Sequence, residues 1–289
     1  MEARVNAALR LVKPKKLTAF AWYGGKNSHL KWLLPLLPKC GHYVEPYGGS
    51  AAVLLNREPS TYETYNDINQ DVYNFFKVLR EQKDELLEQL KYTPYSRQEF
   101  GESLKIPLGE ISNLEKARRF YVRIGQSFMS QENTRADSNW SYSISSCGGT
   151  KKKARSFANK RENLKFVVER LALTQIENRP ALYVIEHYDT PDTLFYVDPT
   201  YLAESRTKKD MYKHEMTTED YVALASALNG CEGKVALSAY EHPFVDNLFP
   251  PPKWRKTKDK PRTIFGGGLR TEILYTNYEP LQSRPGRLW

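Results

Sequence analysis

The segment that most constrains the fold is residues 42–56, HYVEPYGGSAAVLLN. It combines a short strand at residues 42–45, a Gly-rich turn at 46–50 and a helical stretch at 51–56. A strand, a tight turn and a helix in this order open a βαβ unit. A second strand follows at 61–66, and residues 71–90 carry apolar side chains at helical spacing. The sequence therefore predicts an α/β fold with parallel strands.

The rest of the chain separates into strand-like and helical regions. Strand patterns return at residues 193–197, 234–240 and 272–278. Helical patterns without intervening strands occupy 97–104, 114–128 and 159–172, and a further helix interrupted at Pro35 is expected at 27–37. Residues 130–150 are polar and predict a long loop or a β-ribbon. We expect a sheet domain split by a mostly helical insert.

Composition excludes several classes of protein. The 289 residues are 40% hydrophobic and 27% charged, which is typical of a globular chain. The three cysteines, Cys40, Cys147 and Cys231, form no C-x-x-C pair, so we expect neither a disulfide framework nor a metal site. The start of the chain does not resemble a signal peptide, and no apolar run approaches the ~18 residues of a membrane span. We therefore expect a cytoplasmic protein without membrane contact.

Positive charge is concentrated in two segments. The net charge is +9, yet residues 151–165 alone carry seven basic residues and one acid, and residues 253–262 carry six basic residues and one acid. Focused positive charge favours a polyphosphate partner such as a nucleic acid. A solvated surface explains such runs equally well.

Two acids stand at the carboxyl ends of the first two predicted strands. Glu45 ends the first strand, and Asp67 comes 22 residues later, at the end of the second. An acid at this second position can accept both hydroxyls of a ribose. The turn lacks the G-x-G-x-x-G pattern of a pyrophosphate site, so the residues favour a nucleoside without phosphates, such as S-adenosylmethionine. The alternative is a buried turn with Asp67 capping a helix.

A third acid follows the strand at 193–197, in the segment TLFYVDPTY. Asp198 and the carbonyl of Pro199 together can accept both hydrogens of an exocyclic amine, and Tyr201 offers a ring for stacking. The alternative is a β-turn in which Asp198 caps a helix.

These segments, taken together, resemble the Dam-like α group of DNA adenine-N6 methyltransferases. The resemblance rests on five motifs in the family's order: AWYGGK at 21–26, VEPYGGS at 44–50, YNDIN at 65–69, DPTY at 198–201 and TEILYTNY at 271–278. The chain departs from the family's D-P-P-Y at Thr200. The resemblance implies a Rossmann-like S-adenosylmethionine-dependent methyltransferase sheet, residues 17–80 and 171–289, with a basic segment at 1–16. It also implies that residues 81–170 are an inserted, mostly helical target-recognition domain.

The resemblance also implies residue roles. Trp22 and Lys26 would contact the cofactor S-adenosylmethionine, Glu45 would face its methionine end, and Asp67 would hold its ribose. Asp198, Pro199 and Tyr201 would handle a flipped-out adenine, with Asp198 also beside the cofactor. Residues 130–158 would be a DNA-facing ribbon. The candidate DNA contacts are Arg123, Arg135, Trp140, Lys151, Lys152, Lys153 and Arg155.

The implied activity is site-specific methylation of adenine N6 in double-stranded DNA near the nucleoid. Three alternatives stay open: an N4-cytosine DNA methyltransferase, a catalytically impaired DNA-binding homologue because of Thr200, and an RNA methyltransferase. The resemblance also leaves open a cognate restriction endonuclease as a partner, and it leaves the oligomeric state open.

Overall fold

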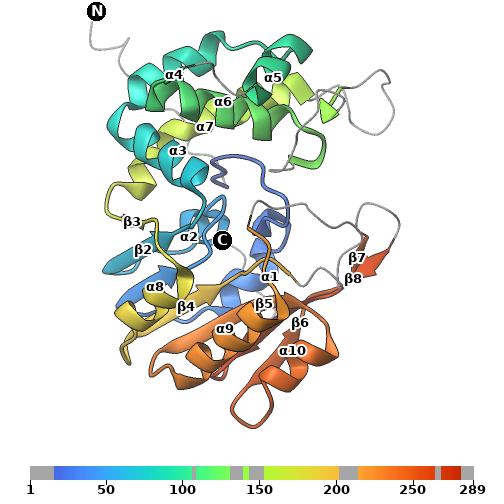
Figure 1. Ribbon diagram of the computed structural model, residues 1–289. Helices are drawn as coiled ribbons and strands as arrows, with labels where there is room; N and C mark the ends of the chain where they lie inside the picture. The colour runs from blue at the N-terminus through green and yellow to red at the C-terminus, as the bar shows by residue number, and fades with distance from the viewer. Residues whose placement is uncertain are drawn as a thin grey trace, which may run out of the picture.

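The computed structural model describes residues 16–105, 109–130, 139–142, 153–201, 214–263 and 268–280. A seven-stranded sheet lies between two layers of helices (Figure 1). Its strands, in spatial order, are β3 (Gln175–Glu177), β2 (Tyr62–Asn66), β1 (His42–Glu45), β4 (Thr193–Val197), β5 (Lys234–Tyr240), β9 (Glu272–Thr276) and β6 (Arg255–Lys258). This architecture confirms the predicted α/β fold.

The strand order is Rossmann-like. Strands β3, β2, β1, β4 and β5 are parallel neighbours, whereas β9 runs antiparallel to both β5 and β6. The chain leaves β1 toward β2 on one side and leaves β4 toward β5 on the other. The topological switch point therefore lies between β1 and β4, and the crevice at the carboxyl ends of these strands is where open α/β sheets bind ligands.

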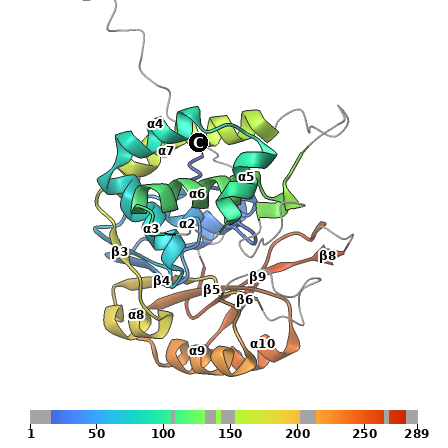
Figure 2. The same ribbon diagram turned by 45° about the horizontal axis from the view of Figure 1, so that its top comes forward.

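The helices form one layer on each face of the sheet (Figures 1 and 2). One layer contains α3 (Gln70–Glu81), α4 (Lys83–Tyr92), α5 (Arg97–Leu104), α6 (Asn113–Gln126) and α7 (Lys153–Leu171). The other contains α8 (Ala181–Tyr188), α9 (Thr218–Gly230) and α10 (Pro243–Leu248). Shorter elements complete the described chain: η2 (Lys26–Ser28), α1 (Leu30–Leu33), η3 (Leu34–Leu36), α2 (Ala52–Asn56), η4 (Phe128–Ser130), β7 (Arg262–Thr263) and β8 (Leu269–Arg270).

Local sequence explains where the helices begin. Ser96 and Ser112 each accept a hydrogen bond from the backbone N–H three residues on, at the starts of α5 and α6. Thr217 and Asp220 form a reciprocal capping box at the start of α9. The stretch expected as one helix at 71–90 is two helices, because the backbone leaves the helical region at Gln82. The last helix of the insert begins at Lys153, six residues before the predicted start.

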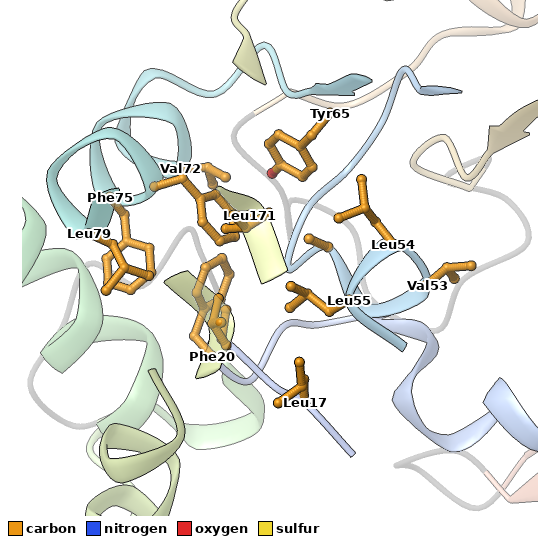
Figure 3. Close-up of a cluster of buried hydrophobic side chains, with 14 of the residues drawn as sticks. Leu17, Phe20, Val53, Leu54, Leu55, Tyr65, Val72, Phe75, Leu79 and Leu171 are labelled. Carbon is orange, nitrogen blue, oxygen red and sulfur yellow. The ribbon is translucent and has the colours of Figure 1, made fainter. Parts of the chain in front are cut away.

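The helices of the insert share one hydrophobic core with the sheet. Phe20, Leu55, Tyr65, Phe75 and Leu171 come together from distant parts of the chain (Figure 3). The same cluster contains Phe120 of α6 and Phe157 of α7, whereas a second cluster packs α8, α9 and α10 against the opposite face. Burial of this apolar surface holds α4, α6 and α7 against α3 and against residues 16–26, called the N-terminal segment below.

The basic segment at residues 253–262 is neutralised by neighbours. Lys256 pairs with Glu241 and Asp246, at 3.3 and 2.6 Å, and Arg262 pairs with Asp259 at 3.0 Å. Most of the segment is the edge strand β6 and its exit. The structure therefore favours the solvated-surface interpretation for this run over a nucleic-acid contact. In the part of the chain that the structure describes, no helix is long and apolar enough to cross a membrane.

Candidate active site

The Gly-rich turn joins β1 to α2 and places backbone groups at the switch point. Gly49 has φ +50°, and a Cβ there would lie 2.9 Å from Trp22 Nε1. A Cβ on Gly48 would lie 2.0 Å from the Tyr65 ring. Glycine is therefore required at both positions, at Gly49 for the backbone conformation and at Gly48 for the close approach of a ring.

Asp67, at the end of β2, holds this turn. Its Oδ2 accepts from the Gly49 N–H and its Oδ1 accepts from the Asn69 N–H, both at 2.8 Å. Burial raises the pKa of Asp67, and the two backbone hydrogen bonds oppose that shift. The α3 cap is Asn69, not Asp67, since the Asn69 side chain accepts from Asp71 N. Each Asp67 oxygen has lone pairs beyond its one N–H donor, so the carboxylate retains capacity for hydroxyl donors.

Glu45 is buried and forms its hydrogen bonds inside the protein. Its Oε1 accepts from the Tyr43 hydroxyl and from the Leu54 N–H, both at 2.7 Å, and the side chain is buried. Burial raises the pKa of Glu45 to about 8. The structure gives Glu45 a role in anchoring α2, and its contact with the methionine end of a cofactor stays a prediction.

Asp198 follows β4 and meets Lys26 from the N-terminal segment. Lys26 Nζ lies 2.6 Å from Asp198 Oδ1 and 3.6 Å from Glu272 Oε1. Lys26 is only 3% exposed. Burial alone would lower the pKa of Lys26, but the attraction of Asp198 and Glu272 outweighs it and raises the pKa. Burial raises the pKa of Asp198 to about 6 despite the nearby ammonium.

Glu272 is a site residue that sequence reasoning missed. It is 3% exposed and accepts from the Ser238 hydroxyl at 2.6 Å and from the Tyr201 hydroxyl. Because β9 runs antiparallel, its first residue lies at the same sheet edge as the carboxyl ends of β4 and β5. An acid inside the otherwise apolar stretch TEILY was the available signal.

Tyr201 and Pro199 complete the loop after β4. The Tyr201 hydroxyl lies 3.2 Å from Asp198 Oδ1, its ring packs edge-on against Tyr240 at 4.5 Å, and Lys26 Nζ lies 5.0 Å from the ring centroid. Pro199 is buried. The stacking of Tyr201 on a substrate base stays a prediction.

Thr200 ties this loop to the chain that precedes α9. Its hydroxyl accepts from the Met216 N–H at 3.0 Å and donates to the His214 carbonyl at 3.4 Å, and its carbonyl accepts from the Tyr221 hydroxyl at 3.2 Å. A second proline could not make the hydroxyl contacts. The structure thus provides a tether at the position where the chain departs from D-P-P-Y.

The expected cofactor and DNA contacts are placed as follows. Trp22 is half-buried beside Gly49 and packs edge-on against Phe20 at 5.6 Å. Arg123 pairs with Asp71 at 3.0 Å. Trp140 forms an isolated β-bridge with Ser127, and Lys153 and Arg155 are exposed in the first turn of α7. Arg135, Lys151 and Lys152 lie outside the described residues. Contact of these residues with DNA stays a prediction.

Two residues that the sequence analysis did not select flank Trp140. The Tyr142 ring stacks on Trp140 with 5.9 Å between centroids, and the Arg97 guanidinium lies 4.9 Å from Trp140 and 5.5 Å from Tyr142. Tyr142 is 57% exposed. The three side chains form an aromatic and cationic platform on the insert, of the kind that stacks with nucleobases. Within the described residues, no cluster of three or more His, Cys, Asp or Glu side chains is arranged to hold a metal ion.

The fold and the site define an α/β protein with three acids at the carboxyl ends of its central strands. A family model for the D12 class N6 adenine-specific DNA methyltransferases matches residues 22–260. The chain belongs to this family.

Several known proteins are similar to the chain. The DNA N-6-adenine-methyltransferase of Escherichia phage P1 is 33% identical over 81 residues, and the DNA adenine methylase of Vibrio cholerae is 35% identical over 78 residues. Each match covers 27% of this chain, but it spans only 11% of the phage protein and 28% of the Vibrio protein. The type II methyltransferase M.MjaIII of Methanocaldococcus jannaschii is 25% identical over an alignment 289 positions long, which covers 88% of this chain and 95% of that protein. Among solved structures, a putative methyltransferase from Escherichia coli, yhhF, matches 87% of this chain and 84% of its own, at 11% identity and a TM-score of 0.36.

Proposed function

We propose that this protein transfers a methyl group from S-adenosylmethionine to N6 of a flipped-out adenine in duplex DNA. The observation that carries the proposal is the arrangement of Asp198. Lys26 and Tyr201 hold its Oδ1, and within the described residues no group is hydrogen-bonded to its Oδ2. An oriented acceptor at the switch point, followed directly by the Pro199 carbonyl, suits an amine with two hydrogens.

Methyl transfer to adenine requires that its N6 become more nucleophilic than it is in the free base. The N6 lone pair is delocalised into the ring, and two acceptors on the N6 hydrogens favour a pyramidal amine and stabilise the positive charge that develops. Asp198 and the Pro199 carbonyl are the proposed acceptors. Lys26 and Glu272 hold Asp198 and Tyr201 before substrate arrives, so no reorganisation is needed during the reaction.

The residues present fit S-adenosylmethionine. Asp67 has free acceptor capacity for ribose hydroxyls, the turn brings backbone close to Trp22, and residues 46–50 of this turn lack the G-x-G-x-x-G pattern of a pyrophosphate cradle. Trp22, Lys26, Glu45, Asp67 and Asp198 are the proposed cofactor-binding residues. When bound, the cofactor supplies an electrophilic methyl group on its sulfonium.

The target base must leave the duplex, because N6 is not accessible to the site within a base-paired helix. We assign the positioning of that duplex to the insert at residues 81–170, with Arg123, Trp140, Lys153 and Arg155 as the described candidates. The proposed setting is the cytoplasm, on nucleoid DNA. A cognate restriction endonuclease is a separate proposal, tested by cutting of the host's DNA when this protein is removed.

The test uses the purified protein with S-adenosylmethionine labelled in its methyl group, and offers duplex DNA and RNA in parallel. After digestion to nucleosides, the label is expected in N6-methyladenine from DNA alone. Label in N4-methylcytosine, or in RNA alone, would overturn the proposal. Absence of transfer to either substrate, with DNA binding retained, would identify an impaired homologue.

A further inference from the structure

A cavity of about 130 Å³ lies between the N-terminal segment, α6 and α7. Phe20 and Ala21 line it from the N-terminal segment, and Tyr121 and Lys160 line it from the two helices. Gly125 and Phe157 also line it, at a close approach of α6 and α7, since a Cβ on Gly125 would lie 2.7 Å from the Phe157 ring. The switch-point acids do not line this cavity.

Among the described residues that line the cavity, the polar side chains all carry a hydrogen-bond donor and none is a carboxylate. The lining residues with hydroxyls are Tyr121, Ser127, Ser130 and Ser156, of which Ser127 donates to the Ile124 carbonyl at 3.4 Å, and those with ammonium groups are Lys153 and Lys160. Such a set complements an anion with several acceptor oxygens. Lys153 and Ser156 also lie in the first turn of the 19-residue helix α7, where the helix dipole favours negative charge.

The ammonium group of Lys160 is expected to lower the stability of the folded protein when no anion is bound. Lys160 is partly buried, and among the described residues the only charged group that affects it is another cation, Lys153, with no carboxylate partner. Burial and the nearby charge of Lys153 lower the pKa of Lys160. A partly buried lysine beside another cation lowers the stability of the folded protein unless an anion binds between them. Locally unfavourable arrangements of this kind are typical of functional sites.

Tyr121 gives an independent indication. Its side chain is 2% exposed, and within the described residues its hydroxyl has no hydrogen-bond partner. Phe75 and Phe157 pack against its ring, at centroid distances of 5.8 and 5.3 Å. A buried hydroxyl without a partner is unfavourable, and a ligand oxygen in the cavity would satisfy it.

We propose that this cavity binds a phosphate group, with Lys160, Lys153 and the Tyr121 hydroxyl as its donors. The location of the cavity favours a phosphate of the DNA backbone over free phosphate. Ser127 lines the cavity and also forms a β-bridge with Trp140, which belongs to the predicted DNA-facing segment. This source rests on the proposed function. A free phosphate has the same chemistry and is separated from DNA by the experiment below.

The test compares the wild type with Lys160→Met and Tyr121→Phe. The matched control is Lys165→Met, which removes the same charge from another face of α7. Duplex DNA binding is measured without cofactor over a range of salt. Lys160→Met is expected to weaken binding roughly tenfold and to reduce the magnitude of the salt slope by about 0.9. Tyr121→Phe is expected to weaken binding roughly threefold with the slope unchanged, and Lys165→Met to change neither.

Inorganic phosphate distinguishes the two sources. If the cavity takes free phosphate, millimolar phosphate should raise the melting temperature of the wild type but not of Lys160→Met, while the DNA slopes stay equal. Equal DNA slopes together with no phosphate-dependent melting shift would overturn the proposal. Lys160→Met should itself melt no lower than the wild type, because it removes a partly buried charge, so loss of folding is separable from loss of binding. Failure of the proposed function would appear separately, as no methyl transfer by the wild type, because the DNA-binding and melting measurements need neither cofactor nor turnover.

Discussion

Lys26 Nζ lies 2.6 Å from Asp198 Oδ1, although 172 residues separate the two side chains in the sequence. The pair is mostly buried, and Glu272 shares the ammonium at 3.6 Å. Asp198 is therefore both a substrate acceptor in the proposed reaction and part of the internal structure.

Replacement of Asp198 by alanine should abolish methyl transfer and also lower stability. The variant leaves the Lys26 ammonium with one carboxylate partner fewer, at a cost of about 1.5–3 kcal/mol. Urea unfolding measures the cost, and the double variant Lys26→Met/Asp198→Ala should lose less stability than the sum of the two single variants. Strict additivity would mean that the pair has no coupling.

Methyl transfer should fall on the acid side of neutrality. Burial raises the pKa of Asp198 to about 6, and the protonated carboxyl is a poorer acceptor for the amine hydrogens. The single-turnover rate should therefore rise with pH through about 6 and level off above it. A rate independent of pH across this region would remove Asp198 from the acceptor role.

The neighbours of Asp198 should move this pH profile in opposite directions. The Lys26 charge lowers the pKa of Asp198 and the Glu272 charge raises it. Lys26→Met should consequently shift the acid limb to higher pH, and Glu272→Gln should shift it to lower pH. Glu272→Gln keeps an acceptor for Ser238, so its thermal melting temperature should change little. If the acid limb moved in the same direction in both variants, its assignment to Asp198 would be wrong.

Replacement of Asp67 by alanine should weaken S-adenosylmethionine binding by about 1.5–3 kcal/mol, which calorimetry can measure. The variant also loses the acceptor for Gly49 N, so Asp67→Asn serves as the control that keeps an oxygen in place. Wild-type affinity in both variants would limit Asp67 to holding the turn.

The Thr200 hydroxyl should matter more than the missing proline. Thr200→Val removes the acceptor for Met216 N and should lower stability by about 1 kcal/mol, together with the rate of methyl transfer. Thr200→Ser keeps the hydroxyl and should retain most of the rate. Equal rates for the valine and serine variants would show that the tether is dispensable.

Glu45 should make stability depend on pH. Its pKa is about 8 in the folded protein against an ordinary 4.5, so between these values the unfolded chain releases a proton that the native state keeps. Stability should therefore fall as pH rises from about 4.5 to about 8. Glu45→Gln should remove part of this fall in urea unfolding, whereas Glu58→Gln, at an exposed position, should not.

Much of the sheet and several helices were predictable because local patterns encode them. The strands at 42–45, 193–197 and 234–240 have the bounds that their apolar runs predict, and α5 has the bounds of its helical pattern. Glu45, Asp67 and Asp198, at the carboxyl ends of β1, β2 and β4, were predicted to be site residues for a general reason. The carboxyl ends of parallel strands meet at one edge of a sheet, so the position of an acid along its own strand is sufficient.

Tertiary structure decided the contacts that depend on strand order and direction. Glu272 joins Asp198 only because β9 is antiparallel beside β5, and nothing in a single strand's pattern states its direction or its neighbour. Tertiary structure also decided which side chains of the two basic segments, residues 151–165 and 253–262, have a carboxylate partner. Glu241 and Asp246 neutralise Lys256 across the fold, whereas Lys160 lines a cavity without a carboxylate among the described residues. Charge is a property of the sequence, but whether a charge is paired, solvated or buried depends on which distant residues the fold places beside it.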